Sequence, residues 1–335
     1  MNEVEKRKLK FLYHQSAIET RYSVLPDYSL NADEWQFYPA SENLEPFPDL
    51  GLRMHWFNKT AAALSVSAIE KCISDKIDKE DITHLITVSC TGMSAPGLDL
   101  QIMESMNLPA NVFRTSINFM GCYAAIHGMK LADAFCEKDK NAKVLVICTE
   151  LCTLHFQKEN TMDNIASSLL FGDGAAAVLI TNDSCNENGL HINNFYSEVS
   201  FKGKKDMSWQ LSNTGFLMTL SGYVPDLLEQ DFNNLLRNAL TNAGYSKTDI
   251  SHWCIHPGGK RILTSIEKSI DITSEDLKHS YDVLKNYGNM SSPTILFVLK
   301  EILDSLKDKT EKKTNIFGAA FGPGLTLETF ILSDD

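Results

Sequence analysis

Hydrophobic positions along the chain alternate between the spacing of helices and the spacing of strands. A period near 3.6 predicts helices over 61–73, 98–106, 122–138, 223–243 and 261–270. Apolar runs and alternating positions predict strands over 82–89, 113–119, 144–149, 175–180, 191–198 and 252–256, and two further helices lead to a closing hairpin over 315–321 and 325–332. Strands that alternate with helices predict an α/β fold, with a mixed sheet covered on both sides.

The pattern is interrupted once and then starts again. A charged, Asn-rich stretch covers 181–189, and strand and helix signals resume after it. We therefore predict two similar halves, 1–185 and 186–335, with a boundary within 182–190. No Pro-rich or Gly/Ser-rich linker separates them, so the halves are expected to pack tightly. A chain of 335 residues, 43% of them hydrophobic, is long enough to bury a large core.

Composition and charge exclude several classes of protein. The longest apolar runs are far shorter than the roughly 20 residues needed to span a bilayer, and the first eight residues lack the apolar core of a signal peptide, so we expect a cytoplasmic protein without a membrane segment. A net charge of −12 argues against general binding to nucleic acid. An anionic ligand would need a local basic patch. The candidates are 6–10 with Arg21, 202–205, and 260–261, of which the first two can equally be solvated surface clusters.

The eight cysteines give no sign of a metal site. They are scattered through mostly apolar segments, without a CxxC pair and without histidines at zinc-finger spacing. Reduced thiols without metal fit this pattern best.

Cys122 stands out among these cysteines because of its position. It follows the strand-like run 113–119 through a short turn and opens the helix predicted over 122–138. A thiol in the first turn of a helix is expected to have a lowered pKa and so to act as a nucleophile. The alternative is that Cys122 is a small buried hydrophobe. That helix is apolar nearly all round, which would place the thiol at the floor of a tunnel suited to water-sensitive acyl chemistry.

Two later segments contain a possible base and a possible amide donor. His256 lies in the segment Trp-Cys-Ile-His-Pro-Gly-Gly at 253–259, and Asn289 lies in Tyr-Gly-Asn-Met-Ser-Ser at 287–292. By themselves, His256 can equally be a turn histidine bonded to the backbone, and Asn289 an N-cap or turn residue.

Seven motifs together resemble the chalcone synthase family, the type III polyketide synthases of the thiolase-like superfamily, in a bacterial-type form. In chain order they lie at 82–97, 121–122, 144–150, 170–177, 256–259, 287–292 and 321–328. They include Tyr-Gly-Asn-Met-Ser-Ser and Phe-Gly-Pro-Gly-Leu-Thr, and they occur in the family's order. The resemblance implies a thiolase-like layered αβαβα architecture made of two similar halves.

The resemblance also implies an activity. Cys122 would be the nucleophile, His256 its partner and Asn289 the third member of the site. An acyl-CoA starter would load on Cys122, be extended by decarboxylative Claisen condensation with malonyl-CoA, and close to a pyrone, resorcinol or phloroglucinol-type product. Neither a cofactor, a metal nor a carrier protein is implied. A homodimer is implied, because the turn at 94–96 matches a loop that reaches across the two-fold axis in relatives.

Further positions are matched to the substrate cavity and to coenzyme A. Phe171 matches an aromatic gatekeeper, whereas Met218 stands where a second phenylalanine is expected, and Trp209 adds bulk where plant members are small. We therefore hypothesise an aliphatic or malonyl-derived starter. The cavity residues are Phe171, Met218, Trp209, Ser167, Cys90, Cys152, Leu154 and Ser291, and the coenzyme A residues are Lys260, Arg261, Gly258 and Arg21.

Two other histidines lie closer to Cys122 in sequence. His127 points to another side of the predicted helix, so we interpret it as structural. His155 is expected to face the cavity.

Two other functions remain open from the sequence. A ketoacyl-carrier-protein synthase of the priming type shares the fold and the Cys, His and Asn set, although its C-terminal motifs differ. A non-catalytic dimeric scaffold could keep the fold without the chemistry. Dependence on a carrier protein distinguishes the first function, and the absence of a fast-reacting Cys122 distinguishes the second.

Overall fold

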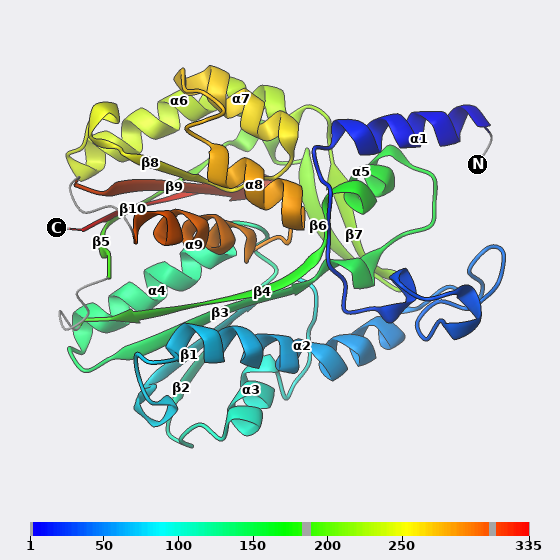
Figure 1. The fold of residues 1–335 in the computed structure, drawn as a ribbon, viewed down its shortest axis with the longest axis horizontal. Helices are drawn as coiled ribbons and strands as arrows, with labels where there is room; N and C mark the ends of the chain where they lie inside the picture. The colour runs from blue at the N-terminus through cyan, green and yellow to red at the C-terminus, as the bar shows by residue number, and fades with distance from the viewer. Residues whose placement is uncertain (1–2, 183–188, 308–312, 335) are drawn as a thin grey trace.

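The computed structural model describes residues 3–182, 189–307 and 313–334. Five layers stack on one another, helix, sheet, helix, sheet, helix, as Figure 1 shows. This arrangement confirms the α/β, αβαβα prediction. The predicted boundary between residues 185 and 186 lies outside the described residues.

The first sheet comes from the N-terminal half, in the order β2-β1-β3-β4. Its strands are β1 His84–Ser89, β2 Phe113–Asn118, β3 Lys143–Leu151 and β4 Asp173–Thr181. Strands β2, β1 and β3 are parallel, and β4 runs antiparallel to β3. Helices α2 (Leu50–Ile73) and α3 (Leu98–Met106) cover its outer face.

The second sheet comes from the C-terminal half, in the order β5-β10-β9-β8. Its strands are β5 His191–Val199, β8 His252–Ile255, β9 Asn315–Gly322 and β10 Thr326–Ser333. The outer layer on this side is formed by α6 (Val224–Ala243) and α7 (Lys260–Ile270).

The middle layer lies between the two sheets. It contains α4 (Ala124–Lys138) and α9 (Thr294–Leu306), with α8 (Lys278–Tyr287) beside α9. Side chains such as Ile126 and Val298 are fully buried there, because both faces of this layer pack against strands. The apolar character of the 122–138 segment is therefore explained by its central position.

Several elements were not predicted. Helix α1 (Glu3–Gln15), helix α5 (Met162–Leu170) and the hairpin of β6 (Met207–Ser212) and β7 (Gly215–Leu220) lie together at one end of the molecule (Figure 1). Helix α2 begins at Leu50 instead of residue 61, because the Asp49 side chain accepts the Leu52 N–H and caps it. Short 3₁₀ helices span Pro26–Tyr28, Ala32–Glu34, Lys79–Asp81, Cys152–His155, Phe201–Gly203, Lys247–Asp249 and Pro323–Leu325.

Candidate active site

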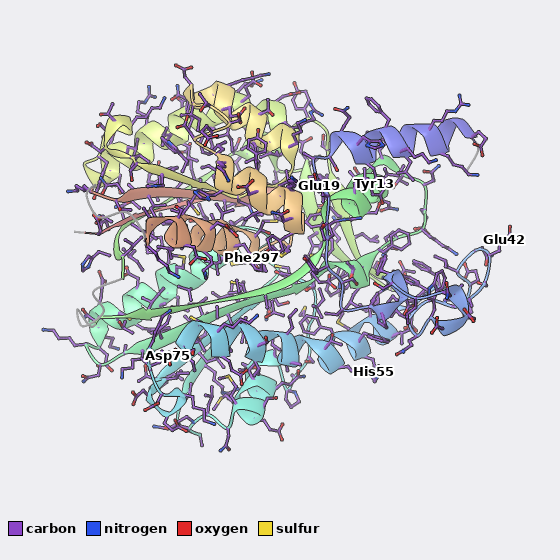
Figure 2. All side chains as sticks on the ribbon, viewed as in Figure 1. Tyr13, Glu19, Glu42, His55, Asp75 and Phe297 are labelled. Carbon is purple, nitrogen blue, oxygen red and sulfur yellow. The ribbon has the colours of Figure 1, made fainter. Side chains whose placement is uncertain are left out.

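A cavity of about 1270 Å³ lies where the two halves meet. Cys122 reaches it from the turn before α4, His256 from the end of β8, and Asn289 from the segment after α8. The N-terminal helix α1 contributes to one wall. Its Tyr13, labelled in Figure 2, lines the same cavity. The three side chains proposed from the sequence are thus brought to one cavity.

The turn that carries Cys122 is held by the C-terminal Gly-Pro-Gly segment. Gly121 has a φ of +90°, and a Cβ atom on it would lie 2.2 Å from Cδ of Pro323. A Cβ atom on Gly322 would lie 2.9 Å from the Tyr123 ring. Both glycines are therefore required by close contact between the segments, and the Phe-Gly-Pro-Gly motif fixes the backbone next to Cys122.

Asn289 is fixed by backbone and side-chain hydrogen bonds. Its N–H donates to the Leu170 carbonyl at 2.8 Å, and its own carbonyl accepts the Gly172 N–H at 3.0 Å, which places Phe171 beside it. Its Oδ1 accepts the Ser291 N–H at 2.8 Å. Ser291 has a φ of +59°, and its Oγ lies 3.6 Å from Cys122 Sγ. This left-handed turn brings the hydroxyl next to the thiol.

His256 is fully buried, yet its ring is unsatisfied. Among the described residues, neither Nδ1 nor Nε2 has a hydrogen-bond partner. The backbone N–H donates to the Ala319 carbonyl at 2.9 Å, and the ring of Phe321 packs edge-on at 5.6 Å between centroids. The backbone and Phe321 thus orient the imidazole while both nitrogens remain available to a ligand.

The electrostatics of Cys122 correct one prediction. The helix begins at Ala124, so Cys122 precedes its first turn. Burial raises the pKa of Cys122 to about 12, although Ser291 and Asn289 act to lower it. Burial likewise lowers the pKa of His256 to about 3. The expected lowering of the thiol pKa is therefore wrong, because desolvation outweighs the nearby donors, and both groups are neutral.

A buried carboxylate beside Cys122 was not singled out from the sequence. Glu150 accepts hydrogen bonds from Cys90 N (2.9 Å), Thr91 Oγ1 (2.8 Å) and Ser292 Oγ (2.7 Å). Burial raises the pKa of Glu150 to about 7, and its charge in turn raises the pKa of Cys122. The sequence feature that could have identified Glu150 is its position, because this acidic residue directly follows the apolar strand predicted over 144–149.

Most of the predicted cavity residues do line the cavity. They are Phe171, Met218, Trp209, Ser167, Cys90, Cys152 and Ser291. Leu154 is the exception, because it is fully buried in the core between α2 and the first sheet. Trp209 and Met218 are direct cross-strand partners in the hairpin of β6 and β7.

The four predicted coenzyme A residues, Lys260, Arg261, Gly258 and Arg21, also line the cavity. Arg261 is 69% exposed and lies 3.7 Å from Asp226. Arg21 has a structural contact as well, since its guanidinium donates to the carbonyls of Ser168 and Phe171 and so ties down the end of α5.

Outside the cavity, Nε2 of His127 lies 3.1 Å from Oε1 of Glu328. Within the described ranges, no group of three or more His, Cys, Asp or Glu side chains is arranged to hold a metal ion. Among the same residues, no helix is long and apolar enough to cross a membrane.

Comparisons with known proteins agree with this geometry. Residues 2–184 match the family model "Chalcone and stilbene synthases, N-terminal domain", and residues 196–334 match the C-terminal domain of the same family. Type III polyketide synthase C of Arabidopsis thaliana is 30% identical over 98% of this chain and 86% of its own length. Probable polyketide synthase 1 of Dictyostelium discoideum is 31% identical over 98% of this chain, which spans 10% of that protein.

Solved structures give the same result. PKS-I of the brown alga Ectocarpus siliculosus superposes with a TM-score of 0.90 at 27% identity, covering 99% of this chain and 90% of that one. The C-terminal type III polyketide synthase domain of Steely1, a type I/III hybrid from Dictyostelium, gives 0.87 at 28% identity, covering 99% and 91%. The fold and site define a condensing acyltransferase. The chain belongs to the chalcone and stilbene synthase family, the type III polyketide synthases, which use acyl-CoA and malonyl-CoA substrates.

Proposed function

We propose that Cys122 accepts the acyl group of an acyl-CoA starter, which is then extended with malonyl-CoA. The observation that supports this role is the cavity itself, where Cys122, Asn289 and His256 meet and where both nitrogens of His256 lack protein partners among the described residues. Because buried polar atoms are almost always hydrogen-bonded, two such nitrogens indicate a place for a substrate oxygen or a transferred proton.

Loading exchanges one thioester for another. The Cys122 thiol gives its proton to His256 as sulfur attacks the thioester carbonyl, the carbonyl carbon–sulfur bond to coenzyme A breaks, and the coenzyme A thiolate takes up the proton. Both groups start neutral because of burial. The charged pair therefore forms only as the substrate binds, and the exchange itself is nearly isoenergetic.

Extension uses His256 and Asn289 as hydrogen-bond donors. The bond between the malonyl carboxylate and the α-carbon breaks, carbon dioxide leaves, and the electron pair becomes an enolate on the coenzyme A thioester. The enolate oxygen accepts hydrogen bonds from the N–H of neutral His256 and from the amide of Asn289. The α-carbon attacks the acyl carbonyl on Cys122, the carbon–sulfur bond breaks, and the chain leaves two carbons longer.

The starter in this proposal is aliphatic or malonyl-derived. Trp209 and Met218 stand opposite each other on the hairpin and face the same cavity, so this wall is bulky and unsuited to a large phenylpropanoid. Cyclisation would give a pyrone, resorcinol or phloroglucinol-type product. We propose that Lys260 and Arg261, which line the cavity at the start of α7, bind the coenzyme A phosphates, and we expect no need for a carrier protein.

We further propose a homodimer. Strand β2 lies at the edge of the first sheet, and Phe113 at its start is 70% exposed. Met93, next to the turn at 94–96, is 53% exposed. An open strand edge with exposed apolar side chains favours pairing with another edge. Sedimentation analysis should give twice the mass of the chain, and a monomer at micromolar concentration would contradict this.

The activity is tested by incubation of the purified protein with malonyl-CoA and a panel of short, long and aromatic acyl-CoA starters, without a carrier protein. Mass spectrometry should show condensation products that disappear in Cys122→Ala. Condensation only after addition of a malonylated carrier protein would instead establish a priming synthase. The absence of any condensation, together with the absence of acyl loading on Cys122 from every starter, would favour a scaffold.

A further inference from the structure

Helix α1 (Glu3–Gln15) lies at one end of the molecule, where it packs against α5 (Figure 1). Leu9, Leu12 and Tyr13 line the cavity and are three and four residues apart, so they lie on one side of the helix. Tyr13 is also 42% exposed, which means that the cavity reaches the molecular surface beside α1. The helix therefore has one side on the cavity and another side on solvent.

The solvent side of α1 is basic. Lys6, Arg7, Lys10 and His14 are all exposed, and their spacings of three and four residues place them next to one another on the helix surface. Lys6 lies 2.9 Å from Glu3, but this ion pair is fully in solvent and is therefore weak. The positive charge of this side of the helix is thus available to an anionic partner.

An exposed aromatic ring lies among these cations. Phe11 is 61% exposed, four residues after Arg7 and three before His14. We call this set of side chains the α1 stripe: Lys6, Arg7, Lys10, Phe11 and His14. Cations attracted to anionic lipids, together with an aromatic ring at the boundary of the acyl chains, are the groups that hold a helix on a membrane surface.

The charge of the whole chain gives the α1 stripe a direction. The net charge is −12, so the chain as a whole is repelled by an anionic surface. A local basic region is attracted to the same surface. Together, the two effects orient the molecule with α1 towards an anionic surface and with its acidic remainder away from it.

The α1 stripe is separate from the groups proposed to bind coenzyme A. Lys260, Arg261 and Arg21 line the cavity, and so do Leu9 and Tyr13 of α1. Lys6, Arg7 and Lys10 are exposed side chains outside this lining. Binding of coenzyme A in the cavity therefore does not account for their charge.

We propose that the α1 stripe docks the enzyme on an anionic lipid bilayer, with its cations at the level of the lipid phosphates and Phe11 in the headgroup region. The use of this docking rests on the proposed function. An acyl-CoA with an aliphatic chain gains free energy for each methylene that it buries in a bilayer. Docking through α1 would place the cavity beside that supply of starter.

The test is co-sedimentation of the full chain with phosphatidylcholine vesicles that contain about 30% phosphatidylserine, at an ionic strength of about 0.1 M. We expect binding to these vesicles and little binding to pure phosphatidylcholine. Binding should be lost at an ionic strength of about 1 M, where the Debye length falls to about 3 Å.

Two variants of the α1 stripe give the size of the effect. Joint replacement of Lys6, Arg7 and Lys10 by glutamine should lower the partition coefficient about 100-fold, because each cation contributes roughly a factor of five. Phe11→Ser should lower it about tenfold through loss of the buried ring. Neither change touches a side chain that lines the cavity.

The matched control replaces three other exposed lysines by glutamine and so removes the same charge. They are Lys278 and Lys285 of α8 and Lys300 of α9. Their distance from α1 exceeds the screening length, so this variant should stay within about threefold of the wild type. Equal losses in the two triple variants would overturn the inference, as would a wild-type chain that does not sediment with anionic vesicles.

Other occupants of the α1 stripe give different results. Release of the bound chain by free coenzyme A would assign these cations to coenzyme A phosphates, and retention on polyglutamate without vesicle binding would indicate an acidic polypeptide. Either result would overturn membrane docking. Vesicle binding is measured without any condensation, so a wild-type protein that bound vesicles but condensed no starter would overturn the proposed function alone.

Discussion

Asn289 and Cys122 are linked through the amide end of the asparagine. Oδ1 of Asn289 accepts the Ser291 N–H at 2.8 Å, so the NH₂ group is the part of the side chain that is left to contact Cys122. The hydrogen bond from this group lowers the pKa of the Cys122 thiol, against the larger effect of burial. The same NH₂ is the donor proposed for the enolate oxygen.

This geometry predicts a selective loss in Asn289 variants. Asn289→Ala should reduce condensation by about 10²–10³-fold, the usual effect of removing one preorganised donor. Asn289→Asp should be at least as severe, because an acceptor replaces the donor. Acyl loading on Cys122, followed by intact-protein mass spectrometry, should fall much less. Equal losses in loading and condensation would show that Asn289 does not act on the enolate.

The raised pKa of Cys122 predicts the pH dependence of its alkylation. With a thiol pKa of about 12, the rate of reaction with iodoacetamide should rise about tenfold for each pH unit between pH 7 and 10, without a plateau. Peptide mapping distinguishes Cys122 from Cys90 and Cys152, which line the same cavity. A plateau below pH 8 that is lost in His256→Ala would instead show a preformed thiolate–imidazolium pair.

Glu150 predicts a change of stability with pH. Its carboxyl has a pKa of about 7 in the fold and an ordinary value of 4.5. Between pH 4.5 and pH 7 the carboxyl is protonated in the folded state and ionised in the unfolded state. The contribution of Glu150 to the free energy of unfolding is therefore fully present below pH 4.5 and is lost as pH rises through 7. Glu150→Gln has no ionisable group at this position, so it does not lose this stability as pH rises. The melting temperature of the variant minus that of the wild type should therefore be about 3 °C larger at pH 8 than at pH 5.

The control for that measurement is Glu70→Gln, which removes one exposed carboxylate from α2. Calorimetry of both variants and the wild type at the two pH values gives the comparison. If the melting temperatures of Glu150→Gln and the wild type differed by the same amount at pH 5 and pH 8, the carboxyl of Glu150 would have an ordinary pKa in the fold.

Trp209 predicts the size of starter and product. Trp209→Gly opens the cavity beside His155 and Phe216 and should allow larger starters or longer chains, with about a tenfold change in kcat/KM between small and large starters. Trp209→Phe keeps an aromatic ring but loses the bond to the Cys90 carbonyl, so its effect should be smaller. If Trp209→Gly accepted the same starters and made the same chain length, this wall would not select substrates.

The position of Lys260 and Arg261 predicts that their removal weakens the binding of coenzyme A thioesters. Alanine at both positions should raise KM for malonyl-CoA about tenfold, with little change in kcat, since the contacts are remote from the reacting carbons. The exposed Arg261 pair with Asp226 is weak, so the guanidinium can exchange partners. Lys300→Ala, an exposed paired lysine on α9, is the matched control. A KM as low as in this control would exclude a role in binding coenzyme A.

The sequence by itself predicted the alternation of strands and helices, and its resemblance to a known family implied the layered fold and the three candidate residues of the site. Periodic apolar positions specify which segments are strands and helices, and short motifs around Cys122, His256 and Asn289 are local enough to be read in one dimension. The apolar pattern did not predict helix α1, helix α5 or the β6–β7 hairpin. In α1 and β6, apolar side chains such as Phe11 and Leu211 are exposed, so the hydrophobic positions do not mark one buried face.

Only the tertiary structure decided the electrostatics and the shape of the cavity. The sequence predicted a lowered pKa for Cys122, whereas burial beside Glu150 raises it, and burial is a property of the whole fold. Leu154 and His155 are adjacent in sequence, yet one packs in the core and the other bridges Thr91 and Phe216. Such contacts join residues far apart in the chain, so their geometry exists only once the two halves have packed together.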